Sequence, residues 1–286
     1  MPIRNRPSAV RAIAPLLALL LAGCGGSEGG DAMGQEATGG SRGSLGEPTA
    51  VFPEDFGAIQ TVRELDDGTV LVADPLGNAL YRVDLAAGSR TQVGAEGQGP
   101  QEYRQPDAVW PLPGDSTLLV DLGNGRLVSL GPDMEFGPTS PLSAGDPREG
   151  LVLAIPTAVD RQGKIYTQSM GMGGGPGGQL PDSGVVLRVD RTAMTADTLV
   201  RVKLTERTRT ESGGPDNRSV SIQQIPLSLE DTWGAAPDGS VVVARSGDYH
   251  VEWHRPDGTV VAGPPVDYEP ASLGNDEKQE WIDAQG

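Results

Sequence analysis

Short apolar runs separated by polar turns recur along the chain from Ile59 onward. The clearest unit has one run over residues 69–74, a turn through Gly77 and Asn78, and a second run over residues 79–83. Runs rich in Val, Leu and Ile that are bounded by Gly, Asn and Asp are typical of β-strands joined by tight turns, because Gly and Asn tolerate positive φ. The pattern predicts a succession of β-hairpins.

The hairpins recur at a nearly constant spacing. Val70 aligns with Leu118 of a second unit, 48 residues later, and Ile165 begins a third unit 47 residues further on; a fourth begins at Val241. Two insertions explain the longer last offset, over residues 171–184 and 205–217. Repeats of about 40–50 residues that contain several short strands are typical of propeller blades. We therefore predict an all-β chain of four-stranded β-propeller blades, of which about four are visible.

Two motifs resemble the NHL-like and six-bladed β-propeller families. Residues 74–83 and 121–130 look like their Asp-x-x-Asn-x-x-hydrophobic hairpin, and residues 97–103 resemble their Gly-x-Gly-Pro-Gly-Glu-aromatic segment, with Gln101 in place of a usual glycine. The resemblance covers roughly residues 50–285 and implies six blades. Because fewer repeats are counted, we expect a truncated or partial sequence; a smaller closed ring and unrecognised strands are the alternatives.

Only the end of the chain favours a helix. Asn275 is a suitable N-cap, Asp276 and Glu277 would lie in the first turn, and Trp281 and Ile282 would share a face. We predict one short C-terminal helix.

The N-terminus has the three regions of an export signal. Arg4, Arg6 and Arg11 supply positive charge, residues 12–22 form an apolar core, and small residues precede Cys24. This core is too short to cross a bilayer whose hydrocarbon layer is about 30 Å thick. The pattern predicts a secretory signal peptide over residues 1–23.

Residues 21–24, Leu-Ala-Gly-Cys, resemble the lipobox of bacterial lipoproteins. The resemblance implies lipidation of Cys24 and attachment to a membrane, which is stable when two or more acyl chains are present. No aspartate follows at Gly25 or Gly26 as an inner-membrane retention signal, which favours the outer membrane; in a Gram-positive host the anchor would lie on the single membrane. An ordinary signal with a chance cysteine is the alternative. Since Cys24 is the only cysteine, no disulfide partner is expected.

The segment after the cysteine is rich in Gly and Ser and has almost no large apolar side chains. It cannot bury enough surface to fold, and as a random coil it would span roughly 25–30 Å. The predicted organisation is a signal peptide over residues 1–23, a lipidated flexible tether over 24–48 and a propeller-like domain over 49–286.

The chain is strongly acidic, with a formal net charge of −17 at pH 7. Removal of the three signal-peptide arginines would bring this to −20 (−17 − 3). Such a surface repels phosphate backbones, which argues against nucleic acid as a partner. The expected location is the cell envelope.

Oxygen-bearing side chains in the repeat are the candidates for a metal site. Asp74, Asn78, Asp121 and Asn124 would suit Ca²⁺, which some six-bladed propellers hold in their central channel. Both pairs occupy the same repeat position, however, where Asp can accept backbone N–H groups and Asn can adopt a left-handed conformation. The structural role is favoured, and no cofactor is assigned.

Candidate catalytic chemistry is sparse. His250 and His254, the only histidines, would be about 13 Å apart along a strand, which is too far to share one zinc ion. The glycines between Gly94 and Gly99 lack the Lys-Ser/Thr ending of a phosphate-binding loop and indicate a turn. Gly-x-Ser-x-Gly occurs only in the predicted tether, over residues 25–29 and 39–43, where no strand precedes it and no helix pattern follows it. No nucleophile elbow and no catalytic residue are therefore assigned.

The mouth of the propeller channel is the expected place for a ligand. Tyr103, Arg104 and Trp110 lie near the entry of the second blade and Trp233 near that of the fourth. Core packing between blades is the alternative role for each aromatic. The glycine-rich loop over residues 171–178 could add to a binding surface.

These features favour a membrane-anchored propeller that binds or scaffolds a protein or glycan in the cell envelope. The alternative is a metal-dependent, lactonase-like propeller hydrolase or lyase that uses acidic residues at the channel mouth. A purely structural envelope protein is a third interpretation. Fold alone does not choose between them, because propellers host all three roles.

The lipobox gives the first testable prediction. The change Cys24→Ser should release the chain from membranes, because the acyl chains that anchor it can no longer be attached. Fractionation of cells into membrane and soluble material measures this. A Cys24→Ser chain that stays with the membranes would contradict the lipoprotein interpretation.

Overall fold

The computed structural model describes residues 46–145, 151–169, 180–214, 217, 219–269, 272 and 274–284. Backbone contacts group Pro48–Gly286 into one compact unit, which holds all the elements given below. The glycine-rich loop predicted over residues 171–178 and the export and lipidation motifs lie outside the described residues.

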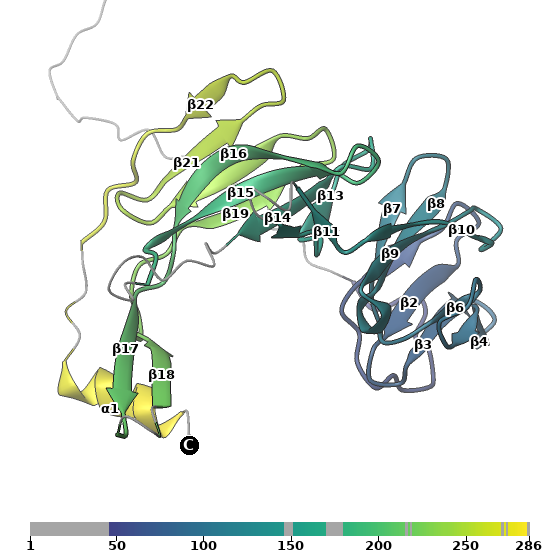
Figure 1. The fold of residues 1–286 in the computed structure, drawn as a ribbon, viewed down its shortest axis with the longest axis horizontal. Coiled ribbons are helices and arrows are strands. Elements are labelled where there is room, and N and C mark those ends of the chain that lie inside the picture. The colour runs from purple at the N-terminus through teal and green to yellow at the C-terminus, as the bar shows by residue number, and fades with distance from the viewer. Residues whose placement is uncertain are drawn as a thin grey trace, which may run out of the picture. The chain divides into compact units, whose positions relative to one another are not determined.

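Four antiparallel sheets of four strands each follow one another along the chain, and within each sheet every strand pairs with the next (Figure 1). The first sheet contains β1 (Val62–Glu64), β2 (Val70–Asp74), β3 (Ala79–Asp84) and β4 (Ser89–Gln92). The second contains β7 (Pro106–Leu112), β8 (Ser116–Asp121), β9 (Arg126–Leu130) and β10 (Phe136–Pro141). The third contains β13 (Ala158–Val159), β14 (Ile165–Ser169), β15 (Ser183–Asp190) and β16 (Thr195–Lys203). The fourth contains β19 (Thr232–Ala235), β20 (Val241–Arg245), β21 (His250–His254) and β22 (Val260–Ala262).

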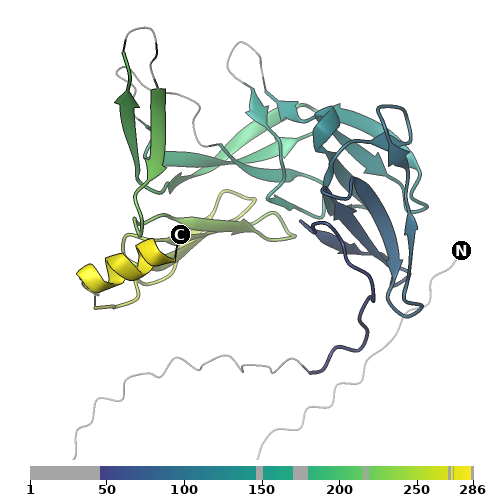
Figure 2. The same ribbon diagram turned by 90° about the horizontal axis from the view of Figure 1, so that it is seen from below.

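Smaller elements lie between and after these sheets. A parallel pair joins β5 (Ala95–Glu96) to β6 (Glu102–Tyr103), and β11 (Ser143–Ala144) pairs with β12 (Val152–Leu153). The second predicted insertion forms a separate hairpin of β17 (Arg207–Ser212) and β18 (Ser219–Gln224), seen in Figure 2. A one-turn 3-10 helix covers Leu122–Asn124, and α1 covers Asn275–Asp283.

The sheets are propeller blades. The first strands of successive sheets contact one another, β1 with β7, β7 with β13, and β13 with β19. The described residues therefore form an all-β, four-bladed propeller with one short α-helix near the C-terminal end, as predicted. The six blades implied by the family resemblance are corrected to four in the described residues. The hairpin motifs behind that resemblance define a single blade and carry no information on blade number.

All four blades share one hairpin register. In it Leu71, and not Val70, is equivalent to Leu118, so the predicted alignment of the first two blades is corrected by one residue. At one position the cross-strand pairs are Leu71–Arg82, Leu118–Ser129, Tyr166–Arg188 and Val242–Trp253. Two residues along, on the same face, the pairs are Ala73–Leu80, Val120–Leu127, Gln168–Val186 and Ala244–Val251. Because side chains alternate between the two faces of a strand, these pairs identify the equivalent face of every blade.

That equivalent face packs on the following blade in the first three blades. Leu80 lies in one apolar cluster with Leu119 of the second blade, and Leu127 lies in another with Ile165 of the third. Val186 lies in a third cluster with Val241 and Val243 of the fourth blade. The middle strands read as continuous apolar runs because both of their faces are buried between neighbouring sheets.

Turn aspartates fasten the first two blades to the chain that enters each of them. Asp74 accepts hydrogen bonds from the backbone N–H groups of Gly57, Ala58 and Gly77 at 2.7, 2.9 and 2.7 Å. Burial opposes ionisation, but these donors outweigh it and lower the pKa of Asp74. Asn78 has a left-handed φ of 49°. The structural role predicted for this Asp-Asn pair is confirmed.

The equivalent Asp121 holds the second blade through similar hydrogen bonds, but here Gly125, and not Asn124, has the left-handed conformation. It accepts hydrogen bonds from the backbone N–H of Arg104 at 2.8 Å, from the Asn124 amide at 2.8 Å and from Arg126 Nε at 2.7 Å. Its oxygens are therefore occupied by protein donors, which keeps the turn and the entering segment together.

The N-cap of the C-terminal helix lies one residue earlier than predicted. Gly274 is the N-cap, and its N–H donates to Glu277 Oε2 at 2.8 Å, so Asn275 is the first helical residue. Trp281 and Ile282 are exposed. Among the residues described, no helix has the length and apolar character needed to span a membrane.

The interblade packing predicts a stability difference between two leucines. Leu119→Ala should lower the free energy of unfolding by about 2–5 kcal/mol, because the side chain is fully buried and its loss leaves a cavity. Leu76→Ala, at a leucine that is 78% exposed, should change it by no more than about 0.5 kcal/mol. Urea unfolding measures both. Equal effects would contradict the assignment of Leu119 to the core.

Candidate functional site

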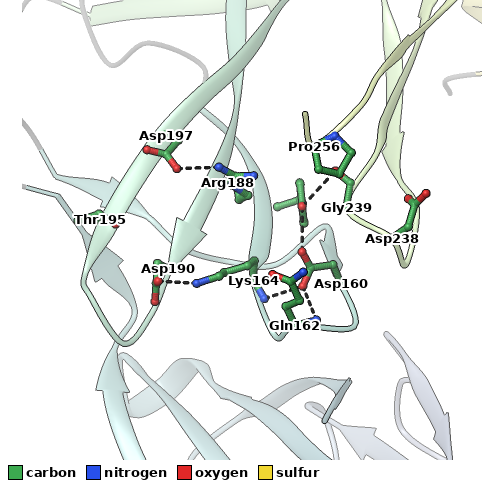
Figure 3. Close-up of a pocket in the computed structure, with 11 residues that line it drawn as sticks. Asp160, Gln162, Lys164, Arg188, Asp190, Thr195, Asp197, Asp238, Gly239 and Pro256 are labelled. Carbon is green, nitrogen blue, oxygen red and sulfur yellow. Dashed lines mark hydrogen bonds and ion pairs between the residues drawn. The ribbon is translucent and has the colours of Figure 1, made fainter. Parts of the chain in front are cut away.

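A polar cleft lies where the third blade meets the fourth (Figure 3). It has a volume of about 240 Å³. Its walls come from β14, β15 and β16 and from three turns: the turn between β13 and β14, the turn before β20 and the turn after β21. Its lining residues are Asp160, Gln162, Lys164, Tyr166, Arg188, Asp190, Thr195, Asp197, Asp238, Gly239 and Pro256.

A buried tyrosine forms the floor of the cleft. The Tyr166 hydroxyl donates to Asp160 Oδ2 at 3.0 Å and lies 3.3 Å from the carbonyl oxygen of Gly239 in the fourth blade. Gly239 has a φ of +89°, and a Cβ there would lie 3.0 Å from this hydroxyl, so the position suits glycine on both grounds. Burial, and then the charge of Asp160, raise the pKa of Tyr166. The hydroxyl remains a proton donor that ties the two blades together.

Asp160 also holds the turn at the edge of the cleft. Its Oδ1 accepts the backbone N–H groups of Gln162 and Lys164 at 2.8 and 2.9 Å. The Asp-x-x-x-Lys spacing thus closes a tight turn. The turn presents Gln162 and Lys164 at the cleft, as Figure 3 shows.

Two ion pairs line the wall. Lys164 Nζ lies 2.5 Å from Asp190 Oδ2, and Arg188 lies 3.1 Å from Asp197 Oδ2 across the β15–β16 ladder. The first pair is about one-third exposed on each side. Hydrogen bonds from Lys164 and from two backbone N–H groups lower the pKa of Asp190 to about 2. The wall therefore alternates donors and acceptors whose charges largely compensate each other.

The chemistry of this lining suits hydrogen bonding. Within the described ranges, no group of three or more His, Cys, Asp or Glu residues is arranged to hold a metal ion. The partly exposed ammonium, guanidinium and carboxylate groups can donate to or accept from a neutral polar ligand without losing their own partners.

The two histidines lie elsewhere, along β21. His250 Nε2 and His254 Nε2 lie 3.3 and 2.9 Å from the two carboxylate oxygens of Glu252 between them. Arg245 donates to the same carboxylate at 2.6 Å, and this contact is the main cause that lowers the pKa of Glu252 to about 2. Contacts with Asp248 and Glu252 raise the pKa of His250. The histidines share a face, as predicted, and Glu252 occupies the space between them.

The four residues predicted to contact a ligand are not brought together. Tyr103 is fully buried, and its hydroxyl accepts the backbone N–H of Leu80 at 2.9 Å. Arg104, beside it, is exposed. Trp110 packs against the core between the second and third blades, and Trp233 packs against the core between the third and fourth, with its indole N–H donating to Gln168. For the three aromatics, these positions favour the core-packing alternative.

Sequence reasoning missed the residues that line the cleft. One available signal was Lys164, one of three lysines in a chain whose basic residues are otherwise arginine. Another was the opposite charge of Arg188 and Asp197 on either side of the turn over residues 191–194, because a hairpin places such residues opposite each other, where cross-strand ion pairs form. Neither signal shows that the turn of the next blade lies against them.

The fold and the cleft define this chain as a propeller with a polar interblade cleft. No family model and no curated protein matches it. Among solved structures, an inactive variant of virginiamycin B lyase from Staphylococcus aureus, crystallised with quinupristin, is 9% identical with a TM-score of 0.37; the match covers 74% of this chain and 57% of that one. A gluconolactonase from Xanthomonas campestris is 11% identical with a TM-score of 0.31, over 69% and 72% of the two chains. These similarities are distant, and the fold assignment rests on the sheets themselves.

The Lys164–Asp190 contact predicts an acid-dependent stability. Asp190 has a folded pKa of about 2, below its ordinary value of 3.8, so its ionised form stabilises the fold above about pH 4 and this contribution is lost as the pH falls toward 2. Lys164→Met should raise the pKa of Asp190, measured by carboxyl NMR titration. Asp190→Asn should flatten the decline in stability between about pH 4 and 2. An unchanged Asp190 titration in Lys164→Met would contradict this.

Proposed function

We propose that this protein is an exported, lipid-anchored binding module that holds a glycan of the cell envelope in the cleft between its third and fourth blades. The observation that carries the proposal is the cleft wall, where Lys164–Asp190 and Arg188–Asp197 present paired donors and acceptors at an open surface. Proposed along with it are a signal peptide over residues 1–23, lipidation at Cys24, a tether over residues 24–48 and an outer-membrane location.

A sugar matches this lining better than an ion does. Each sugar hydroxyl both donates and accepts, so one hydroxyl can bridge a cation and a carboxylate. Because each cation in the wall already faces a carboxylate, an added ion would have to compete with an existing partner. Pro256 adds a small apolar surface beside these groups, as binding sites for small molecules usually require.

The volume of the cleft suits one small part of a ligand. A cleft of about 240 Å³ is below the roughly 300–1,000 Å³ of sites that enclose drug-sized molecules. We expect it to hold a single sugar ring, with the rest of the glycan in solvent. Tyr166 and Asp160 fix the floor, so the site is formed before the ligand arrives.

The test is direct binding. The full chain carrying Cys24→Ser would be screened on an array of neutral hexose and N-acetylhexosamine oligosaccharides, and the best binder measured by calorimetry. Arg188→Met and Lys164→Met should each weaken binding about tenfold or more, because each removes a charged hydrogen-bond donor.

Arg82→Met is the matched control. Arg82 occupies the register position of Arg188 in the first blade and pairs with Asp67 there, so it removes the same kind of ion pair away from the cleft. Affinity should be unchanged in this variant. Loss of binding in Arg82→Met with full binding in Arg188→Met would overturn the site, and the absence of any glycan ligand would overturn the proposed function.

A further inference from the structure

A second polar cavity lies between the first and second blades, and we call it the first–second cavity. It has a volume of about 460 Å³. Residues of β3 and β4 line it, together with Thr69 before β2 and with the turn between β9 and β10 of the second blade. It shares no lining residue with the cleft between the third and fourth blades, so the two are separate places on the molecule.

The two cavities nevertheless occupy equivalent positions. Four lining residues of the first blade stand at the register positions of four lining residues of the third. The equivalent residues are Arg82 and Arg188, Asp84 and Asp190, Ser89 and Thr195, and Thr91 and Asp197. In both blades four residues join the two strands that carry them. The shared register therefore builds the same kind of wall twice.

The turns that border the two cavities match as well. The turn between β1 and β2 closes when the N–H of Leu65 donates to the carbonyl of Thr69 at 2.8 Å, and the turn between β13 and β14 closes in the same way from Asp160 to Lys164 at 3.1 Å. In the blade that follows each wall, the turns between β9 and β10 and between β21 and β22 also share a closing bond, of 2.9 Å in both. The former of these turns brings Met134 to the first–second cavity.

The polar groups of the first–second cavity suit a polyhydroxyl ligand. Arg82 Nε donates to Thr69 Oγ1 at 2.9 Å, and Arg82 also pairs with Asp67, so its guanidinium is held in place. Its side chain is 38% exposed and thus remains accessible. Ser89 and Thr91 are exposed beside it, and each hydroxyl can both donate and accept a hydrogen bond.

The first–second cavity differs from the other cleft in size and in charge. Its volume of about 460 Å³ lies within the roughly 300–1,000 Å³ of sites that enclose small molecules. Val93 and Met134, which pack against the core between the first two blades, add an apolar part to the lining. Thr69 stands in place of Lys164, so the wall holds one ion pair rather than two. We expect room for about two sugar rings but weaker hydrogen bonding.

The interface between the second and third blades shows that register alone does not make this wall. Ser129 occupies the arginine position there. Arg191 of the third blade reaches across and donates to the Ser129 hydroxyl at 2.6 Å. The accessible cation of the wall is therefore replaced by a contact between blades.

We propose that the first–second cavity is a second glycan-binding site, which takes a neutral oligosaccharide of the same class as the cleft between the third and fourth blades. This inference rests on the proposed function, because the ligand class is taken from that cleft. A chain with two such sites can engage two units of one repeating glycan, and this raises the overall affinity without any new contact.

Calorimetry of the Cys24→Ser chain with its best-binding neutral oligosaccharide tests the proposal. We expect two sites per chain, the second about tenfold weaker because one charged donor is missing from its wall. Arg82→Met should reduce the number of sites from two to one and leave the affinity of the stronger site unchanged. Arg188→Met should weaken the stronger site and leave the weaker one as it was.

Arg90→Met is the matched control. Arg90 lies between Ser89 and Thr91 on β4, and alternation places its side chain on the opposite face, where it pairs with Glu54 at 2.9 Å. Two sites should remain in this variant, and circular dichroism checks that each variant is folded. A single site that Arg188→Met removes, or two sites that persist in Arg82→Met, would overturn the second site and leave the proposed function standing. No glycan binding at all would overturn both.

Methyl NMR keeps the proposal testable if Arg82→Met does not fold. The methyl resonance of Met134 in the Cys24→Ser chain, assigned with Met134→Leu, should shift as the weaker site fills, because Met134 lines the first–second cavity. This shift should come at oligosaccharide concentrations well above the dissociation constant of the stronger site. A Met134 resonance that stays unchanged at those concentrations would overturn the proposal.

Discussion

The burial of apolar side chains between successive four-stranded sheets is the constraint on which the rest of this structure depends. Each sheet is too small to bury its side chains alone, so its two faces require neighbours. Leu80, Leu127 and Val186 meet this requirement at equivalent positions in three blades. The chain has one cysteine, so interblade packing and hydrogen bonds rather than disulfides hold the sheets together.

The same packing places the polar chemistry. Alternation along β14 and β15 sends Ile165 and Val189 to one interface and Tyr166 and Arg188 to the other. The apolar interface stops near the ends of the strands. There, charged and hydroxyl groups contact the turn of the next blade. The cleft of Figure 3 is a consequence of that boundary.

Several local features followed from the sequence because they depend on few neighbouring residues. The strand runs and the Asp74 and Asn78 turn are fixed by side-chain alternation and by conformational preference within one hairpin. The repeat was also visible, although the hairpin register shifts its alignment between the first two blades by one residue. The site residues did not follow in this way. Tyr103 and Trp233 were sensible ligand candidates as isolated aromatics, yet both pack in interblade clusters. Whether an aromatic faces a cavity or a core depends on the sheet that lies against it.

The sequence by itself determined the fold class, the four repeats, the helix near the C-terminus and the acidic charge, because each is a property of residues near one another in the chain. It also carries the export and lipidation motifs, whose consequences remain predictions. The tertiary structure decided which turn meets which blade, and so brought Gly239 to Tyr166 across 73 residues. A contact of this kind depends on how two blades pack against each other, and no local pattern of residues along the chain records it.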